Sequence, residues 1–86
     1  MLEFQDSDVE GFPMDALTLP RIRMTTADMP PDSEVRVGDQ VYAYERSIPI
    51  KGHSAHLPRY LNEQIAAGKQ PLIIERLDRF YVYFAK

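Results

Sequence analysis

The chain has 86 residues and a mass of 9.9 kDa, which is the length of one small domain rather than two. Hydrophobic residues make up 44% of it and charged residues 27%, with a formal net charge of −3, a composition typical of a soluble globular protein. It contains no cysteine, which excludes a disulfide framework, a thiol nucleophile and a thiolate metal site.

The beginning of the sequence has no basic segment followed by an apolar one, and no run of about 18 apolar residues occurs in it. We therefore expect a cytoplasmic protein with no membrane contact. A chain this short buries only about 60–65% of its unfolded surface. For that reason we expect a partner or a second copy to contribute to its stability.

The charge is divided unevenly along the chain. Residues 1–40 contain nine acidic and three basic residues, whereas residues 41–86 contain four acidic and seven basic residues. Seven of the nine aromatic residues also fall in the basic half. The two halves can attract each other or face different partners. An ordinary solvated surface explains the same distribution.

The first elements are predicted to be irregular. Residues 1–16 are expected to form an acidic N-terminal arm, in which Phe4 and Phe12 are candidate anchors. Residues 17–86 are expected to form a single α+β domain. Residues 17–24 look extended, and Pro20 lacks a backbone N–H, so this segment is predicted to be an irregular edge strand.

A first β-hairpin is predicted at about residues 34–45, with its turn at Gly38-Asp39. Pairing about this turn places four apolar side chains on one face, namely Val35, Val37, Tyr42 and Tyr44. The opposite face is mixed. This pattern indicates a sheet that lies on a core.

The string Val37-Gly38-Asp39-Gln40-Val41 resembles the Val-Gly-Asp-x-Val turn common in SH3-like small barrels. The resemblance covers these five residues. Further along the chain, residues 48–50 form a short extended piece, and Pro49 again indicates an exposed edge.

A helix is predicted at about residues 57–67. Pro58 suits its first turn, and Gly68 lies where a left-handed residue ends a helix. Apolar residues recur every three or four positions between these limits, at Leu57, Tyr60, Leu61 and Ile65.

A second hairpin is predicted at about residues 72–84, with a bend near Leu77-Asp78. Symmetric pairing puts Leu72 and Ile74 on one face together with Arg76, Arg79, Tyr81 and Tyr83. The other face is also apolar, so these strands are expected at the centre of the sheet. The fold class is therefore α+β, a small, mainly antiparallel twisted sheet with one helix.

The loop before the predicted helix is the first candidate site. A helix N-terminus presents unpaired N–H groups and a partial positive charge, both of which favour an anion. The predicted phosphate or carboxylate ligands are Lys51, Gly52, His53, Ser54, His56 and Arg59. The competing interpretation is a turn, a helix cap and solvated side chains, since the repeated glycines of phosphate-binding loops are missing.

Metal binding and catalysis have weaker support. His53 and His56 form a His-x-x-His pair, and only an acid such as Glu45 or Glu63 is available as a third ligand, whereas zinc takes three or four protein ligands. Ser54 beside these histidines lacks an evident oxyanion hole. We therefore assign no metal, no cofactor and no catalytic residue, and expect the chain not to be an enzyme.

The second candidate site is the hairpin face of Arg76, Arg79, Tyr81 and Tyr83, which has the residue types of a base-stacking surface. The alternative is that the tyrosines are core residues, and an isoelectric point near 5.2 disfavours nucleic acid. Tyrosine, arginine and methionine are enriched at protein interfaces. The leading hypothesis is a non-enzymatic interaction or regulatory module that forms a homodimer or binds another protein. Nucleic-acid or phosphate-ligand binding is the alternative.

Overall fold

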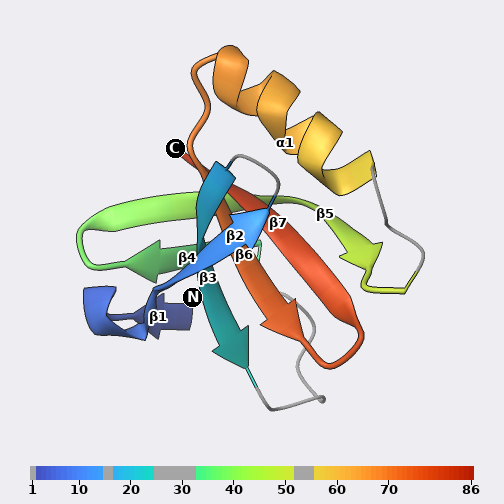
Figure 1. Ribbon diagram of the computed structural model, residues 1–86. Helices are drawn as coiled ribbons and strands as arrows, with labels where there is room; N and C mark the ends of the chain where they lie inside the picture. Colours follow the sequence, from blue (N-terminus) through green and yellow to red (C-terminus); the bar gives the residue numbers. More distant parts are fainter. Residues whose placement is uncertain (1, 15–16, 25–32, 52–55) are drawn as a thin grey trace.

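The computed structural model of the chain describes residues 2–14, 17–24, 33–51 and 56–86 (Figure 1). Its elements in chain order are β1 Leu2–Phe4, the 3-10 turn η1 Asp6–Asp8, β2 Glu10–Met14, β3 Leu17–Met24, β4 Glu34–Val37, β5 Gln40–Pro49, the helix α1 His56–Ala66, β6 Pro71–Arg76 and β7 Arg79–Ala85. The strands form one sheet in the order β1-β4-β5-β7-β6-β3-β2. The fold is α+β, and the sheet is mixed rather than purely antiparallel, because β1 pairs with β4 and β3 with β6 in parallel.

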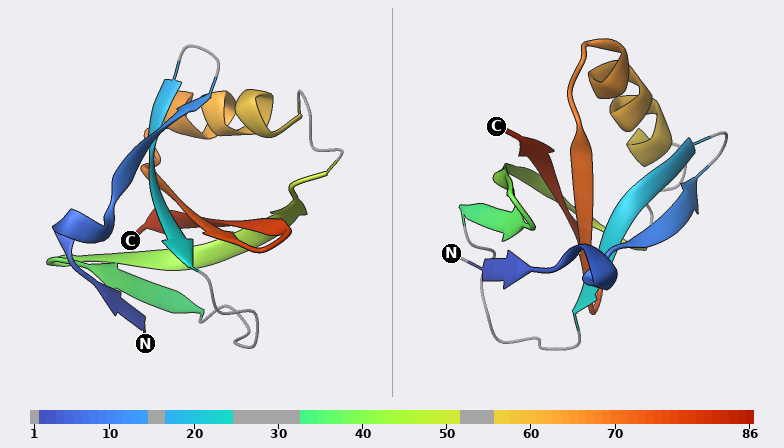
Figure 2. Two further views of the ribbon diagram at one scale, coloured as in Figure 1. Left: turned by 60° about the horizontal axis from the view of Figure 1, so that its bottom comes forward. Right: turned by 90° about the vertical axis from the view of Figure 1, so that its left-hand side faces the viewer.

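Both edges of the sheet come from the N-terminal segment. β1 and β2 are consecutive in the chain yet lie at opposite ends of the strand order, and only residues 5–9 connect them. Such a short connection requires the sheet to curl until its two edges approach each other (Figure 2). The expected arm of residues 1–16 therefore supplies two strands in its described part.

The prediction that residues 17–24 form an edge strand is wrong. β3 lies between β2 and β6. Its antiparallel partner β2 comes from the expected arm, whose irregular apolar spacing gave no strand signal. Pro20 pairs with Gly11 of β2, and the pairing with β6 begins only at Arg21. The proline thus lies in the part of β3 that pairs with β2 alone, and Arg21 is the residue that pairs on both sides.

Both predicted hairpins are confirmed, together with their registers. Gly38-Asp39 joins β4 to β5, and Val35 pairs with Tyr42. Leu77-Asp78 joins β6 to β7, and Leu72 pairs with Tyr83. β6 and β7 lie inside the sheet, as their two apolar faces predict.

The strand β5 is longer than predicted, because it runs on through residues 48 and 49. A register shift between Tyr44 and Arg46 leaves Glu45 as the extra residue of a β-bulge. The bulge reverses the alternation of side chains. Tyr44 packs with the core on one face of the sheet, whereas Ile48, also even-numbered, packs with the core on the other face.

Two hydrophobic clusters lie on the two faces of the sheet. The first lies between the sheet and α1, and its buried members are Leu19, Leu57, Leu61, Ile73, Phe80, Val82 and Phe84. The second lies on the opposite face of the sheet, and its buried members are Ile22, Val35, Val37, Leu72, Ile74 and Tyr83. Leu2 and Phe4 of one edge strand pack against this second cluster, while Phe12 of the other edge strand packs against the first.

The helix prediction is confirmed within one residue at each end. Leu57 and Leu61 are fully buried on the side that faces the sheet. Gly68 has a φ of +89°, and its N–H donates to the carbonyl of Ile65 at 2.9 Å, closing the last turn. Among the described residues, no helix has the length and apolarity that a membrane span requires.

Candidate functional site

The predicted interaction face of the second hairpin is assembled, but two of its four residues are buried and the other two are half-buried. Arg76, Arg79, Tyr81 and Tyr83 lie on the face of the second cluster. Tyr83 is only 1% exposed and Arg76 only 5%. The ring of Tyr44 contacts both tyrosines, with centroids 6.2 Å from Tyr81 and 5.5 Å from Tyr83.

The two arginines of this face also have partners within the chain. The Arg76 guanidinium carbon lies 5.6 Å from the centre of the Tyr81 ring. Arg79 donates from Nε to the Ser47 hydroxyl oxygen at 3.1 Å and from Nη2 to the Ser47 carbonyl at 3.4 Å. A surface that stacks bases needs open ring faces, and the fold covers most of these.

The predicted anion loop lies largely outside the described residues. Gly52, His53 and Ser54 are not among them, and neither is the side chain of His56. Lys51 is exposed. The side chain of Arg59 is 83% exposed and pairs with Glu63 at 3.9 Å along the helix. In the described part of the chain, no three His, Asp or Glu side chains gather as a metal site would require.

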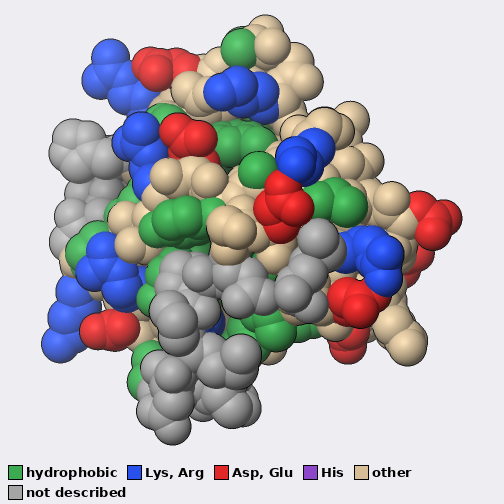
Figure 3. All heavy atoms as spheres, turned by 180° about the vertical axis from the view of Figure 1, so that it is seen from behind, with side chains coloured by type: hydrophobic (Ala, Val, Ile, Leu, Met, Phe, Trp, Pro, Cys, Tyr) green, Lys and Arg blue, Asp and Glu red, His purple; other side chains and the backbone are tan. Residues whose placement is uncertain are grey.

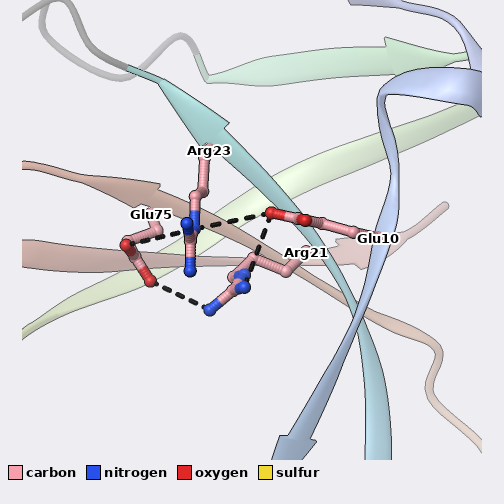
Figure 4. Close-up of polar contacts among 4 residues, drawn as sticks. All are labelled: Glu10, Arg21, Arg23 and Glu75. Atoms are coloured by element: carbon pink, nitrogen blue, oxygen red, sulfur yellow. Dashed lines mark hydrogen bonds and ion pairs between the residues drawn. The ribbon is translucent and has the colours of Figure 1, made fainter.

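The largest cluster of ion pairs in the described part of the chain was not found from the sequence. Figure 4 shows Glu10 of β2, Arg21 and Arg23 of β3 and Glu75 of β6 on three adjacent strands, on the sheet face that also carries the first cluster. Arg21 lies 3.4 Å from Glu10 and 3.2 Å from Glu75, and Arg23 lies 3.4 Å and 3.7 Å from the same carboxylates. No local pattern could have indicated this cluster, because Arg21 and Glu75 are 54 positions apart and only strand pairing brings them together.

This cluster is suited to holding strands together rather than to chemistry. Each carboxylate bridges two guanidinium groups, and such charge-assisted contacts join the strands that carry them. Arg21 is buried, and its guanidinium carbon lies 4.4 Å from the centre of the Phe12 ring. Its Nε–H has no hydrogen-bond partner among the described residues. The cluster ties β2 to the body of the sheet.

An open polar hollow of about 970 Å³ lies beside the first hairpin turn. Asp6, Gly38 and Asp39 belong to its lining. The Gly38 N–H donates to the Phe4 carbonyl at 3.1 Å, and Asp8 accepts a hydrogen bond from the Gln5 N–H at 2.8 Å. The first contact fastens the end of β1 to the hairpin turn, and the second lies within the connection from β1 to β2.

The tip of the second hairpin has a different character. Leu77 is 66% exposed, a large hydrophobic side chain in solvent. Its φ is +26°, in the left-handed region that disfavours residues with a Cβ. The first position of a two-residue hairpin turn with positive φ is normally glycine, asparagine or aspartate. A strained residue with an exposed apolar side chain is a candidate for function.

A small groove adjoins this leucine. It has a volume of about 310 Å³, and its lining residues are Pro49, Ile50, Lys51, Leu77 and Asp78. The Ile50 N–H donates to the Asp78 carbonyl at 2.8 Å, which fastens the end of β5 to the hairpin tip. We refer to these five residues as the tip surface. Its sequence signal was a leucine in place of the glycine or asparagine of such turns.

On the side seen in Figure 3, hydrophobic side chains of the described residues lie in several patches with charged side chains between them. Comparisons with family models, with curated proteins and with solved structures found no match to this chain.

Proposed function

We propose that this chain is a non-enzymatic interaction module that binds a protein through the tip surface. The observation that carries the proposal is Leu77, which holds a large apolar side chain in solvent at a positive φ. Neither property stabilises the isolated fold. An exposed leucine loses the free energy that burial of its side chain would provide, and the positive φ costs about 1–2 kcal/mol. Both are accounted for if the side chain is buried against another protein.

The composition of the tip surface supports the same proposal. Pro49, Ile50 and Leu77 supply apolar contact, and Lys51 and Asp78 place charges beside it. An apolar centre with a charged rim is the usual anatomy of a protein–protein interface. The cytoplasmic location expected from the sequence stays a prediction.

Site-specific photo-cross-linking tests this proposal. The photoreactive residue p-benzoylphenylalanine would replace Leu77 in one variant and Asn62, on the exposed side of α1, in a control. We expect a discrete cross-linked protein product in cells from position 77 and none from position 62. Equal cross-linking from the two positions, or none from position 77, would contradict an interaction at the tip.

Nucleic-acid binding remains the alternative prediction. The burial of Tyr83 and Arg76 does not favour it. Immobilised single-stranded DNA and RNA provide its test, because binding to phosphates weakens as salt concentration rises. Retention at low salt that is lost at high salt would support the alternative, and passage without retention would remove it.

A further inference from the structure

The tip surface contains both a projection and a recess. Leu77 projects into solvent, and the groove lined by Pro49 and Ile50 lies directly beside it. A two-fold symmetric contact brings the same patch of two molecules together. If one residue of the first molecule contacts a second residue of its partner, the same contact occurs again with the two molecules exchanged. A projection beside a recess therefore fits a copy of itself, with the leucine of each molecule in the groove of the other.

The charges of the tip surface have the same symmetry. Lys51 follows the end of β5, Asp78 lies in the hairpin turn, and both line the groove. Both are exposed, and no ion pair of the described residues joins them. A two-fold rotation that sets the end of β5 in one copy against the hairpin turn of the other places Lys51 of each copy opposite Asp78 of the other. The patch is thus self-complementary in charge as well as in shape.

We infer that the partner of the tip surface is a second copy of this chain, bound about a two-fold axis that passes between the two hairpin tips. Each Leu77 side chain fills the groove of the other copy, and two Lys51–Asp78 pairs flank the apolar contact. This inference rests on the proposed function and names the partner.

The size of the contact determines its strength. Five residues a side is far fewer than the 20–30 or so of a standard interface. The dimer is therefore weak and depends on protein concentration. Because exposed ion pairs are screened by salt, added salt weakens it, while the apolar contact of Leu77 persists.

Charge reversal provides the decisive experiment, with association measured by sedimentation equilibrium on the purified full chain. Lys51→Glu places like charges opposite each other in its homodimer, and so does Asp78→Lys. We expect each variant to raise the dimer dissociation constant about tenfold. In an equimolar mixture of the two variants, every pair is again of opposite sign, so the mixture is expected to dimerise as the wild type does.

Two further variants complete the experiment. Leu77→Asn introduces a residue that tolerates a positive φ and removes the projecting side chain. We expect this variant to be monomeric at concentrations where the wild type is dimeric. Asp39→Lys makes the charge change of Asp78→Lys in the other hairpin turn and is expected to leave the dissociation constant unchanged.

The outcomes separate this inference from the proposed function. Recovery of the dimer in the mixture supports the two-fold contact. A wild type that stays monomeric, or a mixture that associates no better than the single variants, overturns it. A cross-link from position 77 to a different protein would then leave the proposed function standing, whereas no specific cross-link from that position would remove both.

Discussion

The two hairpin turns of this protein have the same length and a similar backbone conformation but different residues. Each has two residues, and in each the first residue has a positive φ, +57° at Gly38 and +26° at Leu77. Gly38 is suited to that conformation, and a Cβ there would lie 3.0 Å from an Asp6 carboxylate oxygen. Leu77 is unsuited to it and projects into solvent. The first turn is therefore explained by the fold alone, whereas the second is accounted for by the contact that we propose.

The largest expected effect on the free energy of unfolding comes from placing a leucine, the first residue of the second turn, at Gly38 in the first turn. Gly38→Leu forces a side chain into a positive φ and against Asp6, so we expect a loss of about 2 kcal/mol in the free energy of unfolding. Denaturant unfolding measures it. Asp39→Leu places the same side chain at the next, exposed position without a positive φ and serves as the control. Equal losses in both variants would break the comparison.

A smaller effect of opposite sign is expected at the second turn. Leu77→Asn removes an exposed apolar side chain and supplies a residue that accepts the left-handed conformation, so the free energy of unfolding is expected to rise by about 1 kcal/mol. It is measured below the concentration at which the wild type dimerises. Asp78→Asn is the neighbouring control, with no change expected. A less stable Leu77→Asn variant would mean that the leucine serves the fold itself.

The smallest effect concerns the helix that covers the second hairpin. Tyr60 of α1 packs edge-on against Phe84 of β7, with centroids 6.3 Å apart. Burial raises the pKa of Tyr60 above its ordinary value of 10.0, although Arg46 opposes the shift. Since the unfolded tyrosine loses its proton first, the associated stability is complete below pH 10 and is lost as the pH rises through the folded pKa.

The difference between wild type and Tyr60→Phe isolates this contribution. The free energy of unfolding of the variant is expected to fall less steeply than that of the wild type above pH 10. Parallel pH curves for the two proteins would contradict the docking of Tyr60 described here.

Local signals in the sequence were sufficient for the hairpins and the helix. The turn at Gly38-Asp39, the register about Leu77-Asp78 and the end of α1 at Gly68 each depend on residues close together in the chain. β1 was missed because its partner β4 lies more than 30 residues further along the chain. β2 was missed although its partner β3 follows it directly, because its apolar residues do not alternate. The bulge at Glu45 was missed because it moves even-numbered side chains from one face to the other, which hides the alternation on which strand prediction relies.

The candidate sites show the same division. The sequence placed Arg76, Arg79, Tyr81 and Tyr83 on one face correctly, but burial depends on how the sheet curls, which no local pattern contains. The tip surface joins Pro49 and Ile50 to a turn more than 25 residues away. Only the pairing of β5 with β7 brings them together.

The central claim is that Leu77 and its groove form a contact between two copies of the unmodified chain. The most direct test follows the backbone amide NMR shifts of the wild-type protein as it is diluted. We expect the amides of residues 50, 51 and 76–79 to shift with concentration, while those of Gly38 and Asp39 in the other turn do not. Shifts confined to another surface, or no dependence on concentration at any residue, would contradict it.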